Sequence, residues 1–170
     1  MKGLEAEVSR LDSFIRRLEA QRAVLGWAAA AIEGREGLVL EIGLGNGRTY
    51  DHLRELLPDR EIYVFERDPQ PNPASMPPAP FLVVGDIAET LPAFRERHDA
   101  AAILIHADVT TGVPERDRVV FAGLPADVVA LAQPGATVVS GWPLDHEKLE
   151  PLPRPGEVPE GRYFIYRRID

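Results

Sequence analysis

The sequence of 170 residues contains no cysteine, so disulfide bonds and thiolate metal sites are excluded. It has no apolar run near the ~20 residues that cross a bilayer, which predicts a protein without a membrane-spanning segment. Its amino-terminal segment has a charged, helical pattern rather than that of a signal peptide, so we expect a cytoplasmic protein. A formal net charge of −8 argues against generic nucleic-acid binding, which needs a basic face.

The length and the lack of internal repeats predict a single domain over residues 1–170, with an amino-terminal helical segment at 1–33. From about residue 3, apolar side chains follow one another at alternating spacings of four and three residues. They are Leu4, Val8, Leu11, Ile15, Leu18 and Leu25. This heptad-like stripe has two interpretations: it packs on the protein's own sheet, or it joins copies into a homo-oligomer, which the flanking charges favour.

The segment from Leu38 to Leu53 has the pattern of a strand, a tight turn and a helix. Residues 38–42 are almost all apolar, which predicts a central parallel strand buried on both faces. The glycines Gly43, Gly45 and Gly47 follow at alternate positions, where they can adopt positive φ and let a ligand approach the backbone. The next helix, which Pro58 closes, would present free N–H groups to that ligand.

Further strands are predicted at residues 61–66, 81–87, 100–105 and 136–142, with helices starting near residue 88 and spanning 114–133. The second of these helices is expected to be interrupted at residues 123–125 by a glycine and a proline. Residues 69–80 contain six prolines, which exclude an ordinary helix there. The alternation of residues 162–168 predicts a last, antiparallel strand, and the helix and sixth strand before it are expected to be reduced or missing.

Charged and polar side chains end several of these strands. Glu66 ends the second strand, and its carboxylate can accept hydrogen bonds from both ribose hydroxyls of a nucleotide. Asp86 ends the third strand, although it can equally cap the helix that follows. His106 and Asp108 follow the fourth strand. Because the carboxyl ends of parallel strands meet at one edge, these side chains are expected to line a ligand crevice.

The string Glu41-Ile42-Gly43-Leu44-Gly45-Asn46-Gly47 resembles motif I of the class I S-adenosylmethionine-dependent methyltransferases. The resemblance implies an α/β fold with a doubly wound, Rossmann-like, mostly parallel sheet in three layers, here with an antiparallel C-terminal strand. It also implies S-adenosylmethionine as the cofactor. The residues expected to bind it are Glu41, Gly43, Gly45, Gly47, Glu66, Arg67, Asp86, Ile87 and His106.

The resemblance assigns roles to some of these residues. Asp86 would accept a hydrogen bond from the adenine amino group, and the backbone N–H of Ile87 would meet a ring nitrogen. Glu41, near the methionine end, would suit the cationic sulfonium. His106 and Asp108 are weak catalytic candidates, because in-line methyl transfer needs a base only if the acceptor arrives protonated. We expect no metal site.

The expected reaction is methyl transfer to an unidentified small-molecule acceptor. The N/D-P-P-Y/F motif of amino methyltransferases is replaced by His106-Ala107-Asp108-Val109, so methylation of a base or amide nitrogen is not indicated. One alternative is a nicotinamide-dependent oxidoreductase, which would have to tolerate Arg48 where G-x-G-x-x-G needs its third glycine. The other is a cofactor-binding but inactive oligomeric or interaction protein.

Overall fold

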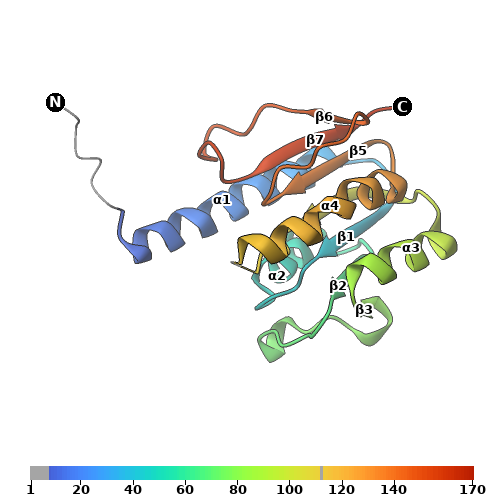
Figure 1. The fold of residues 1–170 in the computed structure, drawn as a ribbon, viewed down its shortest axis with the longest axis horizontal. Coiled ribbons are helices and arrows are strands. Elements are labelled where there is room, and N and C mark those ends of the chain that lie inside the picture. Colours follow the sequence, from blue (N-terminus) through green and yellow to red (C-terminus); the bar gives the residue numbers. More distant parts are fainter. Residues whose placement is uncertain (1–7, 112) are drawn as a thin grey trace.

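The computed structural model describes residues 8–111 and 113–170, which form a seven-stranded sheet with helices on both faces (Figure 1). The strand order is β3-β2-β1-β4-β5-β7-β6. The first five strands in this order pair in parallel, whereas β7 is antiparallel to both β5 and β6. The predicted doubly wound, mostly parallel sheet with an antiparallel C-terminal strand is therefore confirmed.

The elements have the following bounds. The strands are β1 (Leu38–Ile42), β2 (Ile62–Glu66), β3 (Leu82–Val84), β4 (Ala102–Ala107), β5 (Ala132–Ser140), β6 (Leu149–Pro151) and β7 (Phe164–Arg168). The helices are α1 (Arg10–Ala31), α2 (Arg48–Leu56), α3 (Ile87–His98) and α4 (Pro114–Leu131), with the 3₁₀ turns η1 (Pro73–Ser75) and η2 (Ala79–Phe81). None of the helices within the described ranges is long and apolar enough to cross a membrane.

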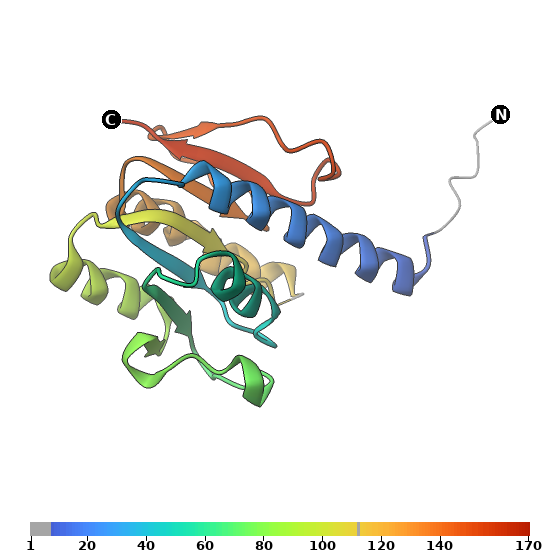
Figure 2. The same cartoon turned by 180° about the vertical axis from the view of Figure 1, so that it is seen from behind.

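The sheet separates two hydrophobic cores. Helices α3 and α4 cover the face that is nearer the viewer in Figure 1, and α1 and α2 cover the opposite face, which Figure 2 shows from behind. Strand β4 is buried along its whole length, as expected for a central strand that pairs in parallel with β1 and β5 and is covered on both faces. The carboxyl ends of β1, β2 and β4 therefore meet at one edge, as the sequence predicted.

Helix α1 packs on the sheet with only part of its length. Ser9 is its N-cap, and the Oγ of Ser9 accepts a hydrogen bond from the Asp12 N–H at 3.0 Å. One face of its second half is buried, but its first half extends beyond the sheet and exposes apolar side chains (Figures 1 and 2). These are Leu11, Phe14 and Ile15, and Val8 just before the helix is exposed as well. The interpretation that the whole stripe packs on the protein's own sheet is thus wrong for this half, and Leu4 lies outside the described residues.

Helix α4 corrects a second expectation. It runs through residues 123–125 without interruption, with Pro125 inside the helix. Proline has no N–H to donate to the carbonyl of Phe121. However, Phe121, Leu124, Pro125 and Val128 are all buried, and this packing offsets the lost hydrogen bond.

The remaining comparisons with the sequence concern β6, the proline-rich segment and the end of β4. Strand β6 exists but has only three residues, and no helix lies between β5 and β6 in the described part of the chain. Residues 69–80 contain only the two short 3₁₀ turns, which confirms the prediction from the prolines. Strand β4 extends to Ala107, so His106 lies within the strand rather than beyond its end.

Candidate active site

The glycine turn between β1 and α2 is shaped by three different constraints. All three glycines have positive φ, at 95° for Gly43, 51° for Gly45 and 90° for Gly47. A Cβ on Gly43 would overlap the Asp108 carbonyl oxygen, and a Cβ on Gly47 would come within 2.6 Å of the Ser75 side chain. Gly45 instead has no neighbour within 4 Å and leaves bare backbone. Of the three glycines, Gly43 and Gly45 line the cavity at this edge of the sheet.

Glu66 ties this turn to the end of β2. Its Oε2 accepts hydrogen bonds from the N–H groups of Leu44 at 2.9 Å and Gly45 at 3.2 Å. Its Oε1 accepts from Arg67 at 2.8 Å and Asp68 at 3.3 Å. One carboxylate thus fixes two backbone segments, and its two longer bonds, to Gly45 and Asp68, are the weaker ones.

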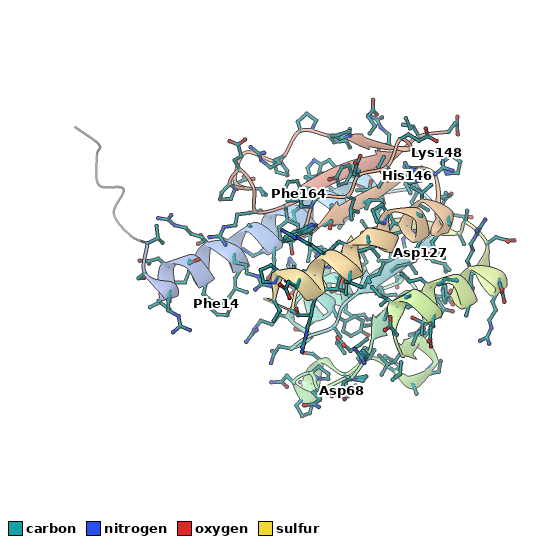
Figure 3. All side chains as sticks on the ribbon, viewed as in Figure 1. Phe14, Asp68, Asp127, His146, Lys148 and Phe164 are labelled. Carbon is teal, nitrogen blue, oxygen red and sulfur yellow. The ribbon has the colours of Figure 1, made fainter. Side chains whose placement is uncertain are left out.

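A cavity of about 360 Å³ opens at this edge of the sheet. Many of the expected cofactor residues line it, together with Asp108 and apolar side chains. From the expected set they are Gly43, Gly45, Glu66, Arg67, Asp86 and Ile87. The lining does not include Glu41, Gly47 or His106. Asp68, which Figure 3 labels on the loop after β2, also lies on the rim.

Asp86 fits both interpretations of its position. It is the N-cap of α3, where its Oδ1 accepts a hydrogen bond from the Ala88 N–H at 2.9 Å. Its side chain is also exposed and faces the cavity. The helix start therefore orients the carboxylate without enclosing it.

Glu41 and His106 form a fully buried pair behind the cavity wall. Strands β1 and β4 place the two residues opposite each other, with Glu41 Oε2 2.6 Å from His106 Nδ1. Glu41 Oε1 also accepts a hydrogen bond from Thr49 Oγ1 at 2.5 Å. Burial lowers the pKa of His106, but the charge and hydrogen bond of Glu41, with the charge of Asp108, raise that pKa above its ordinary value. The direction of this shift favours an imidazolium that is paired with the Glu41 carboxylate.

The pair continues into a chain of hydrogen bonds that ends at the cavity. His106 Nε2 lies 3.2 Å from the Tyr163 hydroxyl, which donates to Asp108 Oδ2 at 3.2 Å. An imidazolium donates from both nitrogens, so in this form Nδ1–H donates to Glu41 and Nε2–H donates to the tyrosine oxygen. Burial, the largest cause, together with Asp108 raises the pKa of Tyr163, so its hydroxyl keeps its proton.

A second, smaller cavity of about 180 Å³ adjoins the first. Its walls come from α1, the glycine turn and the start of α2, and include Arg17, Gln21 and Arg48. Gly43, Gly45, Asp108 and Thr110 line both cavities. The guanidinium of Arg48 lies over the ring of Phe14, 5.7 Å from its centroid, and Figure 3 shows Phe14 on the projecting part of α1.

Comparison with known proteins decides the family. Residues 8–168 match the family model described as S-adenosyl-L-methionine methyltransferase. The chain belongs to this family. A crystal structure of an S-adenosyl-L-methionine methyltransferase from Silicibacter pomeroyi DSS-3 is 46% identical, covers 95% of this chain and 99% of that chain, and has a TM-score of 0.90. The protein is thus an S-adenosylmethionine-dependent methyltransferase, and S-adenosylmethionine is its cofactor.

More distant structures share the fold alone. Cofactor-bound Rv0187 from MTB is 18% identical and covers 96% of this chain and 82% of that chain, with a TM-score of 0.58. The antibiotic-resistance methyltransferase Kmr is 12% identical, and the match covers 83% of this chain and 90% of that chain, with a TM-score of 0.51. A search of curated proteins found no match. The family assignment favours the methyltransferase over the nicotinamide-dependent oxidoreductase that the sequence left open.

Several polar residues of the methyltransferase site were missed by the sequence reasoning. They are Arg17, Gln21, Thr49 and Tyr163. One signal was available for Tyr163: it precedes an antiparallel strand, and such a strand begins at the edge where the parallel strands end. Nothing local in α1 indicates that Arg17 and Gln21 reach Asp108, because that contact depends on how the helix crosses the sheet.

Proposed function

We propose that this methyltransferase binds the adenosine part of S-adenosylmethionine in the larger cavity and transfers the methyl group in line to a small-molecule acceptor. The observation that carries the proposal is the convergence of Gly45, Glu66 and Asp86 on one cavity at the carboxyl edge of the sheet. Bare glycine backbone, a ribose acceptor and an adenine acceptor then lie around a single ligand. Catalysis consists mainly of positioning the acceptor behind the methyl group.

The hydrogen bonds of the site support specific roles. The carboxylate of Glu66 offers about four acceptor positions, and its two longer bonds are the ones that ribose hydroxyls would share or replace. Asp86 uses Oδ1 for its helix cap, so Oδ2 is placed to accept from the adenine amino group. The N–H of Ile87 would meet a ring nitrogen, and Arg67 would border the ribose.

Isothermal titration calorimetry with S-adenosylmethionine tests this placement. The variant Asp86→Ser keeps a side-chain oxygen to cap α3 but removes the carboxylate, so its folding is preserved. We expect the cofactor affinity to fall by about tenfold, since a hydrogen bond to a charged group is worth ~1.5–3 kcal/mol. Glu66→Gln should weaken binding similarly. Asp59→Asn, an exposed residue in the turn after α2, is the control. Unchanged affinity in both site variants would contradict the assignment.

For the acceptor we propose a compact molecule that enters near the smaller cavity, whose volume is about 180 Å³. Of the two catalytic candidates, Asp108 borders both cavities, while His106 is fully buried behind them. We therefore infer that Asp108 receives the proton if the acceptor arrives protonated. Release of S-adenosylhomocysteine in a panel of small phenols, amines and thiols tests the activity. Turnover of tRNA or protein substrates with none in the panel would contradict the small-molecule assignment.

We also propose that the exposed first half of α1 joins copies of the chain into a homo-oligomer. Leu11 is 68% exposed and lies on the projecting half of α1 with Phe14 and Ile15, and Val8 directly precedes this helix. Apolar side chains gathered in this way favour burial against another surface. Light scattering should show a dimer or larger species, and Leu11→Arg should dissociate it. Val119→Arg, which alters a 77% exposed side chain of α4, should not. A monomeric wild-type protein would refute the proposal.

Three expectations rest on the sequence and remain proposals. We propose a cytoplasmic location, no generic nucleic-acid binding and a single domain over residues 1–170. The net charge of −8 supports the second of these. A single calorimetric unfolding transition, no retardation of random-sequence DNA, and cytoplasmic fractionation would agree with them.

A further inference from the structure

Asp108 lies at the junction of the two cavities. It is the first residue after β4, and its N–H donates to the Ile42 carbonyl at 3.0 Å, which places it beside the glycine turn. Among the described residues, it is the acidic side chain that lines both cavities. Any ligand that continues from the larger cavity toward the smaller one therefore passes this carboxylate.

Neutral hydrogen-bond donors hold the side chain of Asp108 in place. Its Oδ2 accepts hydrogen bonds from Gln21 at 3.0 Å and from the Tyr163 hydroxyl at 3.2 Å, and Oδ1 accepts from Thr110 at 3.3 Å. These donors are neutral, so they hold the carboxylate in place without cancelling its charge. The nearest cation, Arg17, lies 3.4 Å away with half of its side chain exposed, where solvent screens it. Asp108 therefore keeps much of its negative potential.

Glu41 does not provide such a charge. It was expected to suit the sulfonium, but its carboxylate is fully buried and its Oε2 lies 2.6 Å from Nδ1 of His106. The lining of the two cavities includes neither Glu41 nor His106. The negative charge at the junction is that of Asp108.

The ends of the strands indicate where the sulfur of the cofactor lies. Strands β2 and β4 flank β1, so their carboxyl ends are roughly 10 Å apart across the glycine turn. With the ribose at Glu66, beyond β2, the sulfur attached to that ribose is directed across the turn toward Asp108. This step rests on the proposed placement of adenosine in the larger cavity.

We propose that Asp108 is the residue that distinguishes the cationic cofactor from its neutral product. A carboxylate attracts the sulfonium of S-adenosylmethionine, but it gains nothing from the uncharged thioether of S-adenosylhomocysteine. During transfer the acceptor atom bonds to the methyl carbon, the bond from that carbon to sulfur breaks, and its electron pair stays on sulfur. The attraction to Asp108 is lost in the same step, so the spent cofactor leaves more readily.

Calorimetric titration of the full chain with each compound tests this inference. We expect the wild-type protein to bind S-adenosylmethionine about tenfold more tightly than S-adenosylhomocysteine, as a partly shielded charge pair allows. In Asp108→Asn, which keeps the size and shape of the side chain, the two dissociation constants should agree within about twofold. The ratio is the readout, because a general loss of structure weakens both compounds alike.

A second variant, Arg17→Gln, keeps the inference testable if Asp108→Asn does not fold. Arg17→Gln removes the cation that competes for Asp108, so the preference for S-adenosylmethionine should increase by about threefold. Asp59→Asn changes the net charge equally at an exposed turn and should leave the ratio unchanged. If Asp108→Asn has the same ratio of dissociation constants as the wild type, the inference is overturned. If Asp108→Asn does not fold, a wild-type ratio in Arg17→Gln overturns it instead. A wild-type protein that binds neither compound overturns the proposed function and this inference together.

Discussion

The substitution Glu41→Gln tests whether the buried pair at the centre of the sheet is charged. Glutamine retains an oxygen for the hydrogen bond from Thr49, so the change removes mainly the charge. The imidazolium of His106 is then left without its counterion, fully buried. Breaking a buried ion pair in this way costs about 3–5 kcal/mol, out of a total stability of roughly 5–15 kcal/mol for a domain. For a chain of this size the melting temperature should fall by about 6–20 °C.

The loss of stability in Glu41→Gln should depend on pH, and the titration of His106 determines whether it grows or shrinks as pH rises. In the wild-type protein its pKa is raised, so the stabilisation by the pair is fully present below the unfolded value of about 6.5 and is lost as pH rises through the folded value. Without Glu41, burial, the largest cause, lowers the pKa of His106, and only the charge of Asp108 still opposes it. The difference between the two proteins should therefore be largest below pH 6.5 and should shrink at higher pH.

Urea unfolding followed by circular dichroism at pH 6 and pH 9 measures the loss of stability in Glu41→Gln and its dependence on pH. The double variant Glu41→Gln/His106→Gln carries no buried charge, so it should be more stable at pH 6 than Glu41→Gln alone, with a coupling energy of the kind that contacting residues show. A loss below about 1 kcal/mol at pH 6, or a loss that is the same at both pH values, would show that the pair is neutral in the native protein.

Two further predictions concern stability. Gly47→Ala should lower the free energy of unfolding by about 1–3 kcal/mol, because alanine is strained at a φ of 90° and its Cβ would meet Ser75; Gly123→Ala, in α4 with no neighbour within 4 Å, should raise it by about 0.4–1 kcal/mol. A Gly47→Ala protein as stable as the wild type in urea would contradict the packing seen here. Tyr163→Phe should cost about 1–3 kcal/mol, since the buried Nε2–H of His106 loses its acceptor, and a thermal unfolding curve that matches the wild type would refute this.

Short-range patterns predicted the elements that depend on neighbours in sequence. The apolar run of β1, the glycine turn and the helix that follows all lie within residues 38–56, where backbone preferences and local burial act together. Local patterns also predicted that Glu66, which ends β2, and Asp86, which follows β3 and caps α3, line the cavity.

Other features depend on how strands and helices meet. Glu41 faces His106 because of the register between β1 and β4, which no local pattern encodes, so an acid that looked suited to the cofactor is instead part of the core. The stripe of α1 is uniform in sequence, but the sheet supports only its second half. Pro125 has the sequence pattern of a helix start, yet tertiary burial keeps α4 continuous through it.

The strand order has a consequence for synthesis. β7 is the last strand in sequence but lies between β5 and β6, and Tyr163, which directly precedes it, provides the link between His106 and Asp108. A ribosome releases residues in chain order at about 5–20 per second, so Glu41 and His106 emerge well before this tyrosine. A nascent chain can therefore pair the five parallel strands early, but it completes the polar interior only when its final strand arrives.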